Sequence, residues 1–492
     1  MNSRARLVAL VFLLAATLAT ELLYLPAAAG GFLGNDFSYL DQAQTIPFFQ
    51  HPWLALHQGT SYYFRPVPAL LWSILYSLFG LHPLPYHLFS ISLHLLVTAL
   101  LVLWVYQLAE DPLAAGVAGL LFAVLPSHPE AVIWNSANTD LLGTVFCLAA
   151  IIAYHRFSQR QNWWWFGLAL LSSALAMLSK GFAFFLPLLI PLFDLTRKGL
   201  VRPDRNRLIA WSSLWVLAAI LWAARTVLVA GQFSHPTGLS PLSQFPSNWL
   251  ANFWIFLWPR VPQGRPVLAA GLWTLAVAGI LALGLIRNWR TPALLAPAAL
   301  LLLGLIPGSV LNRVGPEAEF SRILYFPSLG LAALLGIALT RNRSWPALAV
   351  GAPAVLIAFV LALWSAQPWI EAGKLSLRLA KDFQGLTLPL EKGEALIVAG
   401  VPLAFHGASF HNNSYTLSVA LALARFPEEF RQRGFAEREQ LPLYAITPAA
   451  PPTEAETLTI PRLRQLKRGP AGDFRYRLIW QYLQGTFTVV NP

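Results

Sequence analysis

The chain has 492 residues, of which 56% are hydrophobic and only 11% are charged, whereas soluble globular domains carry roughly 25% charged residues. The net charge is +12, but the basic residues lie in short segments between apolar runs, and no basic helix or aromatic stacking platform favours nucleic-acid binding. The single cysteine, Cys147, lies inside an apolar run. This excludes an internal disulfide and argues against thiolate catalysis and cysteine-based metal sites.

Long apolar runs predict about eleven membrane-spanning helices. They lie near residues 7–29, 83–108, 113–127, 138–157, 163–179, 181–195, 207–230, 266–286, 292–311, 323–340 and 345–365. Runs 113–127 and 181–195 are short for a full span. The first run ends in Ala27-Ala28-Ala29, which resembles a signal-peptide cleavage site, but its length and the spans that follow favour an uncleaved first helix.

The basic residues of the spanning region predict the orientation of the chain. With the N-terminus inside, alternate loops place 13 basic residues inside: Arg4, Arg6, Arg156, Arg160, Arg197, Lys198, Arg202, Arg205, Arg207, Arg287, Arg290, Arg341 and Arg343. Seven remain on the outer side: Arg65, Lys180, Arg225, Arg260, Arg265, Arg313 and Arg322. The excess of basic residues on cytoplasmic loops therefore predicts a cytoplasmic N-terminus, although the inner loop Glu110-Asp111-Pro112 carries no positive charge.

The predicted fold class is an all-α polytopic membrane bundle with a small extracytoplasmic α/β domain at the C-terminus. Residues 1–365 form the transmembrane module, with a first outer loop at about 30–82, and residues 366–492 form the second domain. Within that tail, 395–400 and 475–489 have strand-like patterns. Residues 67–79 are apolar but too short to span, so we expect a helix that lies along the membrane interface.

The candidate chemistry lies in polar residues at the outer ends of the predicted helices. Ionisable groups at membrane depth are costly and are therefore functional candidates. The candidates are Asp36, Asp41, Arg65, His128, Glu130, Asp140, Lys180, Arg313 and Arg322.

Each candidate also has a simpler structural interpretation. Asp36 suits a loop turn, and Asp41 suits a helix cap. His128 and Glu130 suit local caps or pairs. The basic residues Arg65, Lys180 and Arg322 suit anchors that reach the lipid headgroups. No DxD or HExxH pattern is present, so we expect no metal site and no cofactor.

The order of several motifs resembles a known superfamily. Asp36 follows the first span, and then come TyrPheArgProValPro (63–68), PheGlyLeuHisProLeuProTyrHisLeuPheSer (79–90), LeuPheAlaValLeuProSerHisProGluAlaVal (121–132), AsnThrAspLeuLeu (138–142), MetLeuSerLysGlyPhe (177–182) and ArgIleLeuTyrPheProSerLeuGly (322–330). Over about 7–340 the chain resembles the GT-C superfamily of membrane glycosyltransferases, and within it the branch that is similar to protein O-mannosyltransferases and includes the TPR-containing enzymes.

The resemblance implies a polyprenyl-phosphate sugar donor and an inverting transfer, on the outer face of a prokaryotic plasma membrane, to a protein or glycan acceptor. The acidic catalytic residue that the family carries in its first outer loop corresponds to Asp36. The basic residue that the family places near the donor phosphate corresponds to Arg322. Lys180, Arg65 and Arg313 are the further basic residues available to the phosphate. The chain departs from the family at Asn35, Gly181 and Ser321, where family members often carry acidic residues, and it has no TPR array.

Three other functions remain as alternatives. A transporter or lipid flippase predicts inverted repeats and charges at the membrane midplane, which the sequence does not display. An O-antigen ligase or polymerase, which uses a diphosphate-linked donor, usually has its large outer loop late in the chain. A non-catalytic membrane scaffold would have its working part in the soluble tail.

Overall fold

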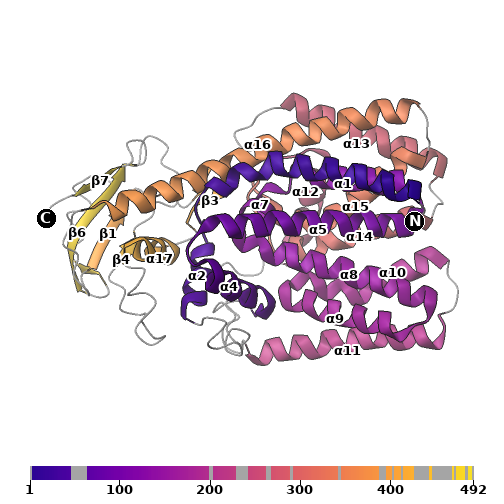
Figure 1. Cartoon of the computed structure of the whole chain (residues 1–492), viewed down its shortest axis with the longest axis horizontal. Helices are drawn as coiled ribbons and strands as arrows, with labels where there is room; N and C mark the ends of the chain where they lie inside the picture. The colour runs from indigo at the N-terminus through magenta and orange to yellow at the C-terminus, as the bar shows by residue number, and fades with distance from the viewer. Residues whose placement is uncertain are drawn as a thin grey trace.

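The computed structural model describes residues 3–45, 64–198, 203–228, 242–261, 267–288, 292–341, 345–386, 395–399, 401, 404–411, 414–425, 443–445, 468–469, 472–481 and 486–489. Residues 46–63 of the first predicted loop, which include Tyr63, lie outside these ranges. Figure 1 shows a bundle of long helices that is joined at one end to a small sheet.

The bundle contains helices α1 (Ser3–Tyr24), α5 (Pro83–Ala109), α6 (Pro112–Ala123), α8 (Asn138–Arg160), α9 (Trp163–Ser179), α10 (Leu186–Lys198), α11 (Arg205–Leu228), α12 (Phe245–Leu257), α13 (Val267–Asn288), α14 (Pro292–Leu311), α15 (Tyr325–Arg341) and α16 (Trp345–Gln384). Each of the eleven predicted apolar runs contains a helix, although α6 ends at Ala123 and so covers only part of the run 113–127. Among the described residues, seven helical segments are long and apolar enough to cross a membrane: Ala5–Ala29, Pro83–Ala109, Asn135–Arg160, Arg205–Val227, Ala293–Leu311, Ser321–Arg341 and Ala349–Gln384. The apolar helical segments around α6, α9, α10 and α13 are shorter than these seven.

Local sequence explains where several of these helices begin and end. Proline opens α5 and α6, where its fixed φ angle suits the first helical turn and its missing N–H costs nothing. Between these two helices Glu110 takes a left-handed conformation, with φ of 54°. The Asp111 carboxylate then accepts a hydrogen bond of 2.9 Å from the backbone N–H of Leu113. The inner loop at 110–112, which carries no positive charge, is therefore a tight, capped turn.

Helices α6 and α15 form the centre of the bundle. α6 packs against α1, α5 and α15, and most of its side chains are buried. Gly336 of α15 permits this close packing, because a Cβ atom there would lie only 2.7 Å from the backbone oxygen of Ala114. Small residues at such contacts let two helix backbones approach each other.

Helix α16 connects the bundle to the C-terminal region. It has 40 residues and therefore extends about 60 Å, so it continues past the end of the bundle toward the sheet (Figure 1). The domain boundary that the sequence predicts at residue 365 falls inside this helix, and the division into two domains stays a prediction. Gly373 of α16 accepts a backbone hydrogen bond of 2.8 Å from Gly31. Helix α16 thereby holds the start of the first predicted loop.

The described part of the C-terminal region contains both strands and a helix. It contains β1 (Ala395–Ala399), β2 (Ala404–Phe405), β3 (Ala408–Ser409), α17 (Ser414–Arg425), β4 (Leu443–Ala445), β5 (Arg468–Gly469), β6 (Gly472–Gln481) and β7 (Thr486–Val489). Strand β1 pairs in parallel with β4 and β6, and β7 pairs antiparallel with β6. The strand-like patterns at 395–400 and 475–489 correspond to β1, β6 and β7.

Short helices gather at the end of the bundle that faces the sheet, and we call this end the sheet-facing end. They are η1 (Leu25–Ala29), α2 (Asp36–Thr45), α4 (Pro66–Phe79), α7 (Pro129–Ile133), η2 (Asn135–Ala137), η3 (Gly181–Phe185), η4 (Leu242–Gln244) and η6 (Ser321–Leu324). Helix α4 contains the short apolar stretch 67–79 and packs against α2. The start of α1 lies at the opposite end of the molecule from β7 (Figure 1).

Candidate active site

Asp36, the first residue of α2, is held by hydrogen bonds from two segments. Its side chain is only 1% exposed. Oδ2 accepts from the backbone N–H of Leu33 at 3.0 Å. Oδ1 accepts from the backbone N–H of Ser136 at 2.6 Å and from the Ser136 hydroxyl. The carboxylate therefore joins the first predicted loop to η2, 100 residues later in the chain.

Ser90 of α5 orients the remaining donor to this carboxylate. Its hydroxyl donates to Oδ1 of Asn138 at 2.7 Å and lies 3.1 Å from Oδ1 of Asn135. The contact at Asn135 Oδ1 leaves the Asn135 Nδ2 group to point toward Asp36, at 3.5 Å from Oδ2. Burial raises the pKa of Asp36 to about 7, although the hydrogen bonds from Ser136, Leu33 and Asn135 oppose this rise. A carboxyl group with this pKa exchanges protons readily near neutral pH.

Glu130 of α7 and Arg322 of η6 form an ion pair beside this segment. The Glu130 carboxylate also accepts from the backbone N–H of Arg322 at 3.2 Å and from the Ser321 hydroxyl at 3.1 Å. Burial raises the pKa of Glu130, while Arg322 lowers it. The pair fixes η6 against α7 and leaves the Arg322 side chain about one-fifth exposed.

Trp134 connects the arginine to the Asp36 segment. The Arg322 guanidinium carbon lies 4.8 Å from the centre of the Trp134 ring, a distance that gives a cation–π attraction. The indole Nε1 of Trp134 donates to the backbone oxygen of Leu33 at 3.0 Å. Arg322 and Asp36 are therefore positioned by the same tryptophan.

Lys180 and Asp140 form a second ion pair, with Nζ and Oδ2 2.7 Å apart. Lys180 Nζ also donates to the Thr139 hydroxyl at 3.1 Å. Burial lowers the pKa of Lys180 to about 7; the Asp140 charge opposes this, and the Arg65 and Arg322 charges add to it. Three basic side chains therefore lie within electrostatic reach of one another, an arrangement that favours an anion between them.

The structure gathers most of the predicted site residues at the sheet-facing end. Asp36, Arg65, Glu130, Asp140, Lys180 and Arg322 are joined by the contacts and charge interactions described above. Asp41 is buried in α2, five residues beyond Asp36, and Arg313 is exposed just after the end of α14. How many of these residues act in a reaction stays a prediction.

His128 lies inside the bundle among aromatic rings. Its Nε2 lies 2.9 Å from the Ser328 hydroxyl, and its ring centre is 4.7 Å from that of Tyr325 and 5.4 Å from that of His94. His94 Nδ1 in turn lies 2.7 Å from the Tyr325 hydroxyl. This cluster fixes the start of α15, directly after Arg322.

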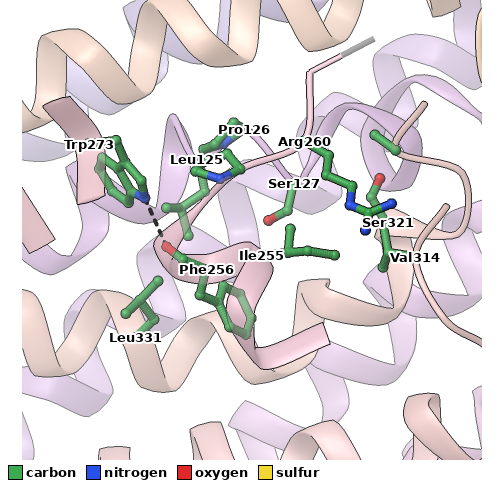
Figure 2. A pocket seen from close by; sticks show the side chains of 12 residues that line it. Leu125, Pro126, Ser127, Ile255, Phe256, Arg260, Trp273, Val314, Ser321 and Leu331 are labelled. Carbon is green, nitrogen blue, oxygen red and sulfur yellow. Dashed lines mark hydrogen bonds between the residues drawn. The ribbon is translucent and has the colours of Figure 1, made fainter. Parts of the chain in front are cut away.

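A small cavity adjoins the Glu130–Arg322 pair (Figure 2). It measures about 10 Å³ and is lined by Ser127, Arg260 and Ser321, among others. Room of this size suits one water molecule. Figure 2 shows the Arg260 side chain extending toward Ser321 and Val314. Arg260 is thus a further cation near the site that sequence reasoning did not select.

Ser136 is the clearest functional candidate that sequence reasoning missed. It lies in the run AsnSerAlaAsn (135–138) directly before α8, and small polar residues before a helix normally indicate a cap. Its partner, however, is the distant Asp36. Across the residues that the structure describes, no group of three or more His, Cys, Asp or Glu side chains could hold a metal ion.

Part of the sequence resembles a known protein family. Residues 60–229 match the family described as dolichyl-phosphate-mannose-protein mannosyltransferase. Over 130 residues the chain is 34% identical to protein O-mannosyl-transferase Tmtc1 of Drosophila melanogaster, and the alignment covers 26% of this chain and 15% of that protein. The chain therefore matches only a small part of this curated relative.

Solved structures extend the likeness to almost the whole chain. The oligosaccharyltransferase of Archaeoglobus fulgidus, in complex with zinc and sulfate, aligns with a TM-score of 0.54 at 14% identity, covering 96% of this chain and 67% of that one. The archaeal oligosaccharyltransferase from Archaeoglobus fulgidus has also been solved with an inhibitory peptide and a dolichol-phosphate, and that structure gives a TM-score of 0.53 at 13% identity, covering 96% and 69%. The chain has the GT-C fold of membrane glycosyltransferases. Together with its long apolar helices, this fold makes it a multi-span membrane protein.

Proposed function

We propose that this GT-C chain is an inverting glycosyltransferase that moves a sugar from a polyprenyl-phosphate donor to an acceptor. The observation that carries the proposal is the position of Asp36, a buried carboxyl with a pKa near 7, in one cluster with Arg322 and Lys180. Transfer to a hydroxyl requires both a base and positive charge for the departing phosphate. The matched mannosyltransferase family and the neighbour solved with a dolichol-phosphate support this donor class.

In the proposed reaction Asp36 acts as the general base. Its ionised carboxylate takes the proton of the acceptor hydroxyl as the oxygen attacks the anomeric carbon of the sugar. The new glycosidic bond forms while the bond from that carbon to the phosphate oxygen breaks, and the electron pair leaves with the polyprenyl phosphate. A single displacement inverts the anomeric configuration.

The basic side chains stabilise the leaving phosphate. Arg322 presents a planar guanidinium, which matches phosphate oxygens well, and Glu130 and Trp134 hold it in place before the donor arrives. Lys180 and Arg65 supply further positive charge. Preorganised charges of this kind often contribute most of a rate enhancement.

The proposed location is the plasma membrane, with the site at its outer face and the N-terminus in the cytoplasm. Arg160 at the end of α8, Arg205 at the start of α11 and Arg341 at the end of α15 support this orientation, because basic residues collect on the cytoplasmic side. Residues 366–492 then lie outside the cell as a second domain, beside the site. The acceptor is a protein or a glycan that reaches the site from that side.

The class of donor is tested by transfer assays in membranes that contain the protein. We expect transfer from radiolabelled sugars linked to polyprenyl monophosphate and little from sugars linked to polyprenyl diphosphate. Two of the cations, Lys180 and Arg322, are already paired with carboxylates, and a monophosphate leaving group needs less added positive charge than a diphosphate. Membranes without the protein provide the background. Preferred transfer from diphosphate-linked donors would instead support an O-antigen ligase type of enzyme, and binding of donor without transfer would support a flippase or scaffold.

A further inference from the structure

A second, larger cavity lies between the Asp36 segment and the C-terminal region. It measures about 170 Å³ and is lined by residues of the first predicted loop, the start of α5, the last turns of α16, His411 and helix α17. The lining is mostly apolar, with Phe37, Leu377 and Leu421 as examples. An apolar cavity of about 150 Å³ is large enough to bind benzene. This cavity therefore has room for one ring or one branched aliphatic group.

His411 is a buried polar side chain of this cavity whose ring nitrogens have no hydrogen-bond partner in the structure. The ring stacks on Phe37, with 5.4 Å between the ring centres. A buried polar group without a partner costs free energy, and this cost disappears if a ligand supplies the missing hydrogen bond.

The chemistry of the lining limits the kind of ligand. Burial lowers the pKa of His411 to about 3, so the ring is neutral at physiological pH and offers one N–H donor and one nitrogen acceptor. Ser376 lines the same cavity but already donates to the backbone oxygen of Phe32 at 2.6 Å. Among the described residues that line the cavity there is no Asp, Glu, Lys or Arg. A neutral ligand with a hydroxyl or an amide fits these groups.

The position of the cavity separates it from the path of a lipid chain. The cavity begins at Gly31, which is fixed to α16 at Gly373, and it extends along α16 from Ser376 to Gln384. At 1.5 Å per residue, Gln384 lies about 16 Å beyond Gly373, away from the bundle. A polyprenyl chain must run the other way, into the lipid around the bundle.

We propose that this cavity is an acceptor subsite, which takes a neutral, largely apolar group of the acceptor that carries a hydroxyl or an amide and bonds to His411. The assignment of the ligand as the acceptor rests on the proposed glycosyltransferase function, whereas the cavity and the kind of ligand that it binds do not. Phe37 directly follows Asp36 and lines the cavity, so a group bound there places neighbouring parts of the acceptor close to the proposed base. His411 and Phe37 thereby contribute to the choice of acceptor.

The ligand chemistry is tested by equilibrium binding of two probes that differ by one hydroxyl. Radiolabelled p-cresol and toluene are bound to the full chain in lipid nanodiscs, with empty nanodiscs as the measure of partitioning into lipid. Wild type binds both probes and binds p-cresol more tightly. His411→Leu weakens p-cresol binding by roughly fivefold to tenfold, the usual value of one hydrogen bond, and leaves toluene within about twofold.

Two variants of α16 complete the binding test. Ala380→Phe fills the cavity from its lining and abolishes binding of both probes, while Lys381→Ala, an exposed neighbour, leaves both unchanged. Absence of specific binding to wild type, or an equal loss of both probes in His411→Leu, would overturn the proposed ligand chemistry.

The acceptor assignment is tested by activity. In the donor assay, Ala380→Phe lowers transfer to the endogenous acceptor at least tenfold relative to hydrolysis of the donor by water. Equal loss of both reactions, or no loss of transfer, would contradict an acceptor subsite. If wild type binds the probes but neither transfers nor hydrolyses any donor, the proposed function fails while the binding site stands.

Discussion

Single residues of the site combine burial with charge, and this combination determines when they are ionised. Asp36 and Lys180 both have a pKa near 7, because burial disfavours the charged form of each group: it raises the pKa of the acid and lowers the pKa of the amine. The proposed reaction needs Asp36 ionised and Lys180 protonated. Both conditions hold together only in a narrow range of pH.

This pairing predicts a bell-shaped dependence of kcat/KM on pH with its maximum near 7. Below about pH 7 Asp36 becomes protonated and activity falls up to tenfold per pH unit, because the base is lost. Above about pH 7 Lys180 loses its charge and the donor binds more weakly. Initial rates at low donor concentration between pH 5 and 9 measure the profile, and Lys180→Arg should extend its alkaline side.

Sequence motifs predicted the acidic and basic residues of the site but not their partners. Asp36, Glu130 and Arg322 could be selected as candidates from the sequence, because charged residues are rare in an apolar chain. The hydrogen bonds of Asp36 to Ser136 depend on the packing of η2 against the first predicted loop, over a separation of 100 residues. Local patterns carry no information on such a contact, since a serine before a helix has an ordinary use as a cap.

At the scale of helices, close packing of backbones holds the proposed site in place. Helix α15 directly follows η6, which contains Arg322, and it packs against α6 and α14. Gly330 and Gly336 of α15 lie at these contacts, where added side-chain atoms would meet the backbone of α14 or of α6. The apolar periodicity of the sequence predicted the helices, but not which of them form the centre.

We predict that Gly336→Ala destabilises the bundle by about 1–3 kcal/mol, because its Cβ would press on Ala114 and Ala118. Gly279→Ala is the matched control: this glycine is also helical, and nothing lies within 4 Å of its added Cβ. Thermal unfolding in one detergent compares the two variants. Equal unfolding temperatures for both would show that the α6–α15 contact is looser than described.

At the scale of the whole molecule, the two ends of the bundle have different compositions. The sheet-facing end carries the acid–base cluster and both cavities, and the other end carries basic residues at helix ends. Hydrophobic runs and charge asymmetry predicted the membrane bundle and the order of its helices. No sequence pattern predicted that α16 continues beyond residue 365 toward the C-terminal region, because the apolar pattern of this helix ends there.

The central claim is that Asp36 is the base of a sugar transfer, and Asp36→Asn tests it most directly. The variant keeps the shape and several hydrogen bonds of the side chain but cannot accept the proton. We expect transfer from the polyprenyl-phosphate donor to fall at least about a hundredfold, while donor binding stays within about threefold. Asp204→Asn, a carboxylate before α11 whose oxygen caps Arg207, is the control and should keep full transfer. Transfer by Asp36→Asn equal to that of wild type would contradict the account and would direct the search for the base to Asp41 and Glu130.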